Sequence, residues 1–138
     1  MTRSLRLLPL LSLLLLASCA TTPANVTGAG TQLETRQIQT REYDTLDKAM
    51  TLRSVIATLQ DLGFTIDQAD AELGTVTATR LHDYTMRMTV TVVQKGEQRI
   101  AVRANARIGE DSVTDAATYQ DFFVVLDKAM FLTLHKVD

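Results

Sequence analysis

The sequence predicts an α+β fold in which two helices cover one face of an antiparallel sheet. Two segments, residues 46–62 and 116–134, repeat their apolar residues with the period of an amphipathic helix. Between them, apolar and polar residues alternate in four runs, as in strands with one buried face. We therefore predict a two-layer sandwich with the order strand, helix, four-stranded antiparallel meander, helix.

The first 18 residues have the pattern of a secretory signal peptide. Arg3 and Arg6 supply a positive start, and a leucine-rich run of about ten residues follows, interrupted by Pro9 and Ser12. Such a run is about half the length that a helix needs to cross a bilayer, so we expect no permanent transmembrane segment. Cys19 is the only cysteine, which excludes a disulfide within the chain.

The end of this leader carries a motif, Leu16-Ala17-Ser18-Cys19, that resembles the lipobox of bacterial lipoproteins. The resemblance implies cleavage before Cys19, a diacylglycerol on its sulfur and a third acyl chain on the new amino group. Two acyl chains are already enough for stable membrane anchoring. Because Ala20 follows Cys19 where an Asp would resemble an inner-membrane retention signal, the resemblance also implies the outer membrane of a Gram-negative bacterium, facing the periplasm.

The composition after Cys19 predicts a tether followed by one domain. Residues 20–31 carry no charge and are rich in Ala, Thr and Gly, which is typical of a flexible segment. We therefore divide the chain into a signal peptide (1–18), a lipidated cysteine with its tether (19–33) and a single α+β periplasmic domain (34–138). Loss of the leader arginines makes the formal net charge more negative than −2, so we expect no general attraction to nucleic acid.

The domain is predicted to begin with a strand and a helix. Residues 35–43 have extended character without one apolar face, so we place them at a sheet edge. Asp44, with Asp47 three residues on, is the predicted N-cap of a helix over residues 46–62 that ends at Gly63. The predicted buried stripe of this helix is Ala49, Leu52, Val55, Ile56, Leu59 and Leu62. Its predicted solvent side is Asp47, Thr51, Ser54, Thr58 and Asp61.

The apolar residues of all four strands after Gly63 carry even numbers, from Phe64 to Ile108. Antiparallel pairing keeps them on one face only if every connecting loop has an odd number of residues. Loops at residues 69–73, 81–83 and 95–97 satisfy this rule, and the last of them places Val92 opposite Ile100. The crossover through the first helix is predicted to leave the first strand parallel to a strand of this meander.

The second helix, predicted over residues 116–134, lies on the same even-numbered face of the sheet. Its apolar stripe is Tyr119, Phe122, Phe123, Leu126, Ala129, Met130 and Thr133. Val124 and Phe131 lie away from this stripe. They are predicted either to pack against the first strand or the C-terminal tail, or to be exposed as a partner site.

One internal stretch also carries a family resemblance. RQIQTREYDT, followed by LRSVIATLQDLGFTIDQADAELGTVTATR, is similar to a group of small bacterial outer-membrane lipoproteins of undefined function. The stretch covers residues 36–80. The predicted strand order also resembles the helix-grip domains of envelope assembly lipoproteins, including lipoprotein subunits of the outer-membrane β-barrel assembly machine. That second resemblance implies a fold and no function.

The chain shows no familiar catalytic or metal-binding pattern. His82 and His135 are its only histidines, and neither lies in H-E-x-x-H or another ligand spacing. The G-x-S-x-G motif and the phosphate-binding glycine motifs are missing too. Several loop acids are better explained by solvation than by catalysis or calcium binding: Asp67, Asp70, Glu72, Glu110 and Asp111. We therefore predict no enzyme, no metal and no cofactor beyond the acyl chains on Cys19.

The odd-numbered face of the predicted sheet is rich in threonine and carries Arg87, Arg103 and Arg107. It is either a plain solvated face or an adhesive surface for an acidic partner, a lipid phosphate or a glycan, because guanidinium groups pair with such anions. Together with Thr89 and Thr91, these arginines are the candidate interaction residues.

These patterns support two hypotheses of function. The first is a non-enzymatic, lipid-anchored envelope protein whose periplasmic domain binds or supports another envelope component, of unknown identity. The second is a carrier or sensor of a small apolar ligand held between sheet and helices, in a space lined by Met86 and Met88.

Overall fold

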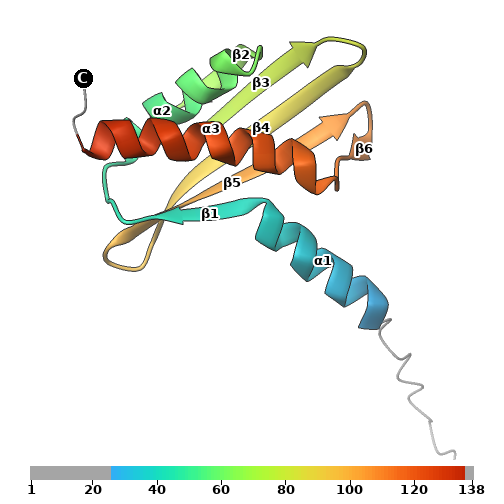
Figure 1. Ribbon diagram of the computed structural model, residues 1–138, viewed down its shortest axis with the longest axis horizontal. Coiled ribbons are helices and arrows are strands. Elements are labelled where there is room, and N and C mark those ends of the chain that lie inside the picture. The colour runs from blue at the N-terminus through green and yellow to red at the C-terminus, as the bar shows by residue number, and fades with distance from the viewer. Residues whose placement is uncertain (1–25, 136–138) are drawn as a thin grey trace, which may run out of the picture.

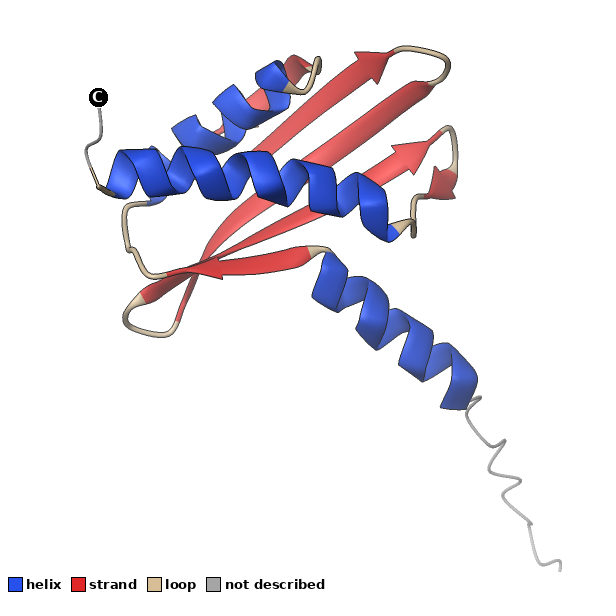
Figure 2. Ribbon diagram, viewed as in Figure 1, coloured by secondary structure: helices blue, strands red, loops and turns tan. Residues whose placement is uncertain are grey.

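The computed structural model of this chain describes residues 26–135 and has the predicted two-layer α+β architecture (Figures 1 and 2). Its sheet is antiparallel, with the order β1-β5-β4-β3-β2, and β6 extends the edge of the sheet beyond β1 by pairing with the end of β5. The helices are α1 (Val26–Ile38), α2 (Lys48–Asp61) and α3 (Ala116–Leu134). The strands are β1 (Thr40–Tyr43), β2 (Thr65–Asp70), β3 (Thr75–Leu81), β4 (Thr85–Lys95), β5 (Arg99–Ile108) and β6 (Asp111–Ser112).

The core lies between the sheet and the pair α2 and α3, which cover the same face (Figure 1). The prediction that even-numbered strand residues are buried is confirmed. The buried residues of β3, β4 and β5 on this face are Val76, Ala78, Met86, Met88, Val90, Val92, Ile100, Val102, Ala104 and Ala106. α3 adds Tyr119, Phe122, Phe123, Leu126 and Met130 to the same core cluster. Ala101 is the exception, since it is buried although its number is odd.

The N-terminal segment differs from its prediction. Residues 35–43 are not one strand, because helix α1 continues to Ile38 and β1 begins only at Thr40. The second half of the predicted tether also belongs to this helix, while Cys19 and residues 20–25 lie outside the described residues. A helical hydrogen bond from the Gln39 amide to the Thr35 carbonyl ends α1, and the Gln39 carbonyl then accepts from the β5 amide of Ala104. Gln39 is therefore the joint between helix and sheet.

α2 begins later than predicted and is rotated about its axis. Its N-cap is Asp47, whose carboxylate accepts from the Met50 amide at 2.8 Å, rather than Asp44. Predicted to face solvent, Thr51, Ser54 and Thr58 are buried, whereas the predicted core residue Ala49 is exposed. The reason is that α2 packs against α3 as well as against the sheet, so its buried arc is wider than one amphipathic face and centred elsewhere.

The meander is confirmed, but the predicted register is not. Val92 lies opposite Val102 rather than Ile100, because the turn between β4 and β5 occupies residues 96–98 and Lys95 still pairs with Arg99. This shift moves the pairing by two residues and so leaves the buried face unchanged. Gly96 opens the turn with a φ of +67°, a conformation that glycine adopts at little cost.

The loop between β2 and β3 has an even number of residues, contrary to the prediction, and a bulge in β2 restores the buried face. Asp70 pairs with Thr75, so the connection has an even length, at residues 71–74. A register shift between Ile66 and Gln68 inserts one extra residue into β2. As a result, Ile66 lies opposite Ala78, and both carry even numbers as the predicted face requires.

β1 and β2 lie at opposite edges of the sheet, and α2 connects them across its face (Figure 1). The alternating antiparallel pairs between them make β1 and β2 point the same way, as the crossover predicts. The strand beside β1 is β5, however, and that pair is antiparallel.

Candidate functional site

One face of the sheet carries no helix, since α2 and α3 both lie on the other side (Figure 2). We call it the outer sheet face. All five predicted interaction residues belong to it, on the adjacent strands β4 and β5. Its polar residues come from β1 (Thr40, Glu42), β3 (Thr75, Thr77, Thr79), β4 (Arg87, Thr89, Thr91, Lys95) and β5 (Arg99, Arg103, Asn105, Arg107).

The register arranges these side chains in rows across the strands. The first row is Thr79, Arg87 and Arg107, the second is Thr77, Thr89 and Asn105, and the third is Thr75, Thr91, Arg103 and Thr40. Successive rows are about 7 Å apart, since two residues of a strand rise by that distance. The outer sheet face is therefore a regular grid of hydrogen-bonding groups with arginines at two of its levels.

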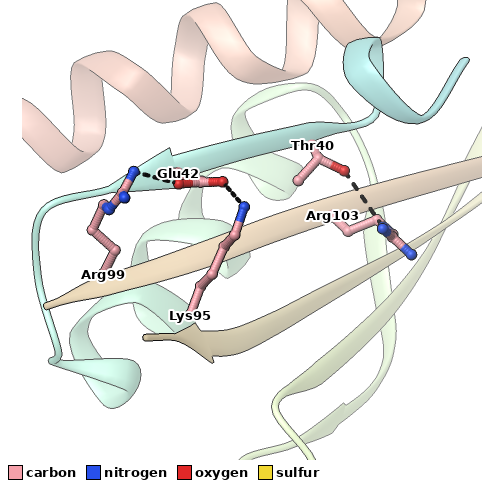
Figure 3. Close-up of polar contacts among 5 residues, drawn as sticks. All are labelled: Thr40, Glu42, Lys95, Arg99 and Arg103. Atoms are coloured by element: carbon pink, nitrogen blue, oxygen red, sulfur yellow. Dashed lines mark hydrogen bonds and ion pairs between the residues drawn. The ribbon is translucent and has the colours of Figure 1, made fainter. Parts of the chain in front are cut away.

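At the β1 end of this face, one carboxylate forms ion pairs with two cations (Figure 3). One oxygen of Glu42 accepts a hydrogen bond from Lys95, and the other accepts from the Arg99 guanidinium at 2.6 Å. The hydrogen bond from Lys95 and the charges of Lys95 and Arg99 hold the pKa of Glu42 below its usual value, against the smaller effect of burial. The ion pairs of Lys95 and Arg99 with Glu42 therefore connect β1 to the two ends of the β4–β5 turn.

Arg103 lies just beyond this cluster and has a neutral neighbour only. Its Nε donates to the Thr40 hydroxyl at a long 3.4 Å, and Figure 3 shows its guanidinium reaching past Thr40, away from Glu42. Within residues 26–135 it makes no ion pair. Its charge is therefore available to an external anion.

Arg87 and Arg107 lie directly opposite each other in the β4–β5 ladder. Like charges in this position destabilise a sheet, and an anion bound between the two would offset that cost. Arg87 has no carboxylate partner in the described part of the chain. Arg107 donates to the Glu110 carbonyl at 2.6 Å, and the Glu110 carboxylate, whose side chain is fully exposed, lies 3.4 Å away. A contact to so exposed a carboxylate neutralises little.

The sequence alone did not identify the residues that determine which arginines and lysines of this face lack a carboxylate partner. Glu42, Lys95 and Arg99 were not singled out, nor was Asn105 between the two arginine rows. Their odd-numbered positions in β4 and β5 were the available signal for three of them. Glu42 carried no such signal, because β1 was predicted with the wrong bounds.

The other side of β1 is a structural contact with α3. The Asp127 carboxylate accepts from the Tyr43 hydroxyl at 2.8 Å and from Arg41, whose guanidinium also lies 5.0 Å from the centre of the Phe123 ring. Burial, followed by the hydrogen bond to Asp127, raises the pKa of Tyr43 well above its usual range. Tyr43 thus remains a hydrogen-bond donor, and this cluster fixes β1 against the helical layer.

The two predicted partner-helix positions on α3 are exposed. Val124 and Phe131 expose 57% and 56% of their surface, so the first strand does not cover them. The Phe131 ring stacks on His135 at a centroid distance of 4.3 Å. Leu132 and Leu134 add further exposed apolar surface at this end of the helix.

The space beside Met86 and Met88 is small. Both side chains are buried in the core, and the cavity that they line with Phe64 and Phe122 has a volume of about 70 Å³. Sites for drug-sized ligands usually measure about 300 Å³ or more. The geometry therefore gives the ligand-carrier hypothesis less support than the outer sheet face gives to partner binding.

The described residues offer no second chemical site of the kinds considered above. His82 lies in the exposed β3–β4 turn, 3.1 Å from the Asp83 carboxylate. Between Val26 and His135, no three His, Cys, Asp or Glu side chains are grouped so that they could hold a metal ion. None of the helices in the same range combines the length and apolarity that a bilayer span requires.

No protein-family model matches this chain, and no curated protein matches it significantly.

Proposed function

We propose that this chain is an outer-membrane lipoprotein, held by acyl chains on Cys19, whose periplasmic domain binds an anionic component of the envelope through the outer sheet face. It acts by binding and not by catalysis. The observation that carries the proposal is the pair Arg87 and Arg107, two like charges placed side by side on a face that no helix covers.

The position of α1 supports this arrangement. The helix meets the sheet at Gln39 and runs outward, away from the layer that α2 and α3 form (Figure 1). Its 13 residues span about 20 Å at 1.5 Å per residue. In a lipoprotein anchored at Cys19, such a spacer would hold the domain off the membrane and leave the outer sheet face open to a partner.

The anchor is tested by labelling. Cells that express the full chain are fed an alkyne-bearing palmitate analogue, and the membranes are then fractionated. We expect label on the wild-type protein in the outer-membrane fraction, and neither label nor membrane association for Cys19→Ser. An unlabelled wild-type protein in the aqueous fraction would refute the anchor.

The binding surface is tested by photo-crosslinking in intact cells. A photoreactive residue at Asn105, on β5 at the end of the second row of the outer sheet face, should capture an envelope component. The same residue at Ala57, which is exposed on α2 on the other side of the domain, is the matched control and should capture little. Equal capture at the two positions, or none at Asn105, would contradict the proposed surface.

A further inference from the structure

Two arginines with few competing partners lie opposite each other on the outer sheet face. Arg87 and Arg107 are cross-strand partners, so their Cβ atoms lie about 5 Å apart, and both side chains are exposed. We propose that this pair, with Asn105 beside it, binds the phosphate group of a phosphomonoester. The inference rests on the proposed function, because it names the ligand chemistry of the same surface.

The geometry favours phosphate over carboxylate. A carboxylate can accept from two cations, as Glu42 does, but it carries a single negative charge. A phosphomonoester offers three terminal oxygens and carries a charge between −1.5 and −2 at neutral pH, so it can accept hydrogen bonds from two guanidiniums at once. It also compensates both positive charges of the pair, which a single carboxylate does not.

The site is partly organised before a ligand arrives. The Glu110 carbonyl accepts from one terminal nitrogen of Arg107 at 2.6 Å, which orients that guanidinium and leaves its other N–H groups free to bind. In the next row, Asn105 and Thr89 lie opposite each other and supply an amide and a hydroxyl within about 7 Å along the strands. On the other side of Arg87, the Thr79 hydroxyl is engaged, since it donates to the Asp67 carboxylate at 2.6 Å.

The same phosphate chemistry has two possible sources, a lipid headgroup and a soluble phosphate. The full-length chain in neutral detergent micelles separates them. One titration uses inorganic phosphate, and another uses micelles doped with phosphatidic acid, a monoester, or with phosphatidylglycerol, a diester. Backbone amide shifts report binding, and we expect the largest shifts in the row of Arg87 and Arg107.

Matched variants test the residues. Arg87→Gln and Arg107→Gln should each weaken phosphate binding by about fivefold or more, because each removes a charge-assisted contact. Arg53→Gln makes the same change of charge on α2, outside this face, and should change the affinity by less than about twofold. Glu110→Gln removes a competing charge, keeps the carbonyl contact, and should tighten binding by about twofold.

The outcomes distinguish a soluble phosphate from a lipid headgroup, and some of them would refute the phosphate site. Saturable, arginine-dependent binding of inorganic phosphate supports a soluble ligand, and binding to phosphatidic acid micelles alone supports a headgroup. Equal binding to both doped micelles, an equal loss with Arg53→Gln, weaker binding with Glu110→Gln, or no binding at all would overturn the phosphate site. Crosslinking from Asn105 without phosphate binding would leave the proposed function intact and refute this inference only.

Discussion

The hydroxyl of Tyr119 joins three separate segments of the chain, and its removal is our main stability prediction. It accepts from the Gln39 side chain at 3.0 Å and from the Ala106 amide at 3.1 Å, and it donates to the Val113 carbonyl at 2.6 Å. The residue is fully buried. Tyr119→Phe therefore deletes one oxygen atom at the junction of α1, β5 and α3 without changing the packing of the ring.

The expected cost follows from what each partner does afterwards. A typical hydrogen bond contributes about 1 kcal/mol net, whereas a buried group left without any partner costs about 1 to 3 kcal/mol. The Ala106 amide lies in a buried strand residue where water does not replace the hydroxyl. Val113 is half-buried and its carbonyl regains water in part, whereas the buried Gln39 side chain does so less. We expect Tyr119→Phe to lower the free energy of unfolding by about 3 kcal/mol.

Urea denaturation of the three Tyr→Phe variants measures this cost with its controls. The chemical change is identical in each, so effects on the unfolded chain are matched. Tyr43 makes one hydrogen bond, to Asp127, and should lose about 1 kcal/mol. Tyr84 is half exposed and should change by less than about 0.5 kcal/mol. A midpoint for Tyr119→Phe that is no lower than that of Tyr84→Phe would refute the role of the hydroxyl.

Three further predictions concern single positions. Gly74→Ala should lower the free energy of unfolding by about 3 kcal/mol or more, because φ is +77° and the new Cβ would overlap the Val92 carbonyl. Gly96→Ala, at φ +67° in open space, should lower it by about 1 kcal/mol. Equal melting temperatures for the two variants would contradict the overlap at Gly74. Thr58→Val should stabilise the protein by about 1 kcal/mol in the same urea assay, because the buried Thr58 hydroxyl has no partner within residues 26–135; a loss of stability would reveal an unseen partner. Glu42 has a lowered pKa in the folded protein, so its contribution is complete above its ordinary value of 4.5 and disappears as the pH falls through the lower folded value. Thermal melting of the wild type and Glu42→Gln, repeated at pH values down to about 3, measures this contribution. The stability difference between the two should shrink as the pH falls below 4.5, and a difference that does not change with pH would contradict the prediction.

The sequence was sufficient to predict the sheet's buried face, because that face depends only on residue parity. Met86, Met88, Val90 and Val92 alternate with polar residues, and any even shift of register preserves the alternation. The exact register was not predictable in the same way. The turn after Lys95 begins one residue later than expected, and nothing in the alternation distinguishes Ile100 from Val102 as the partner of Val92.

The helical layer was predicted less well, because its burial depends on contacts between helices. A pattern of apolar residues locates one stripe, and Thr51 and Thr58 do not belong to it. Both are buried because α3 lies against that side of α2. Small polar side chains allow close packing of helices, but a sequence pattern does not distinguish them from polar residues that face solvent. The edge strand β1 was misjudged for a related reason, since its bounds depend on a tertiary contact between Gln39 and Ala104.

The sequence predicts which cations lie on the outer sheet face, but only the structure shows which of them have carboxylate partners. Residue parity places five cations of β4 and β5 on the outer sheet face, and the sequence does not rank them. The pairing of β1 with β5 brings Glu42 opposite Ala101, where its carboxylate pairs with both Lys95 and Arg99. The excess charge of the face is thereby concentrated in Arg103, one row from Glu42, and in Arg87 and Arg107, three rows from it. Because exposed charges interact weakly beyond about 10 Å, Glu42 does little to cancel the charge of the Arg87–Arg107 row, which makes that row the preferred position for an anionic ligand.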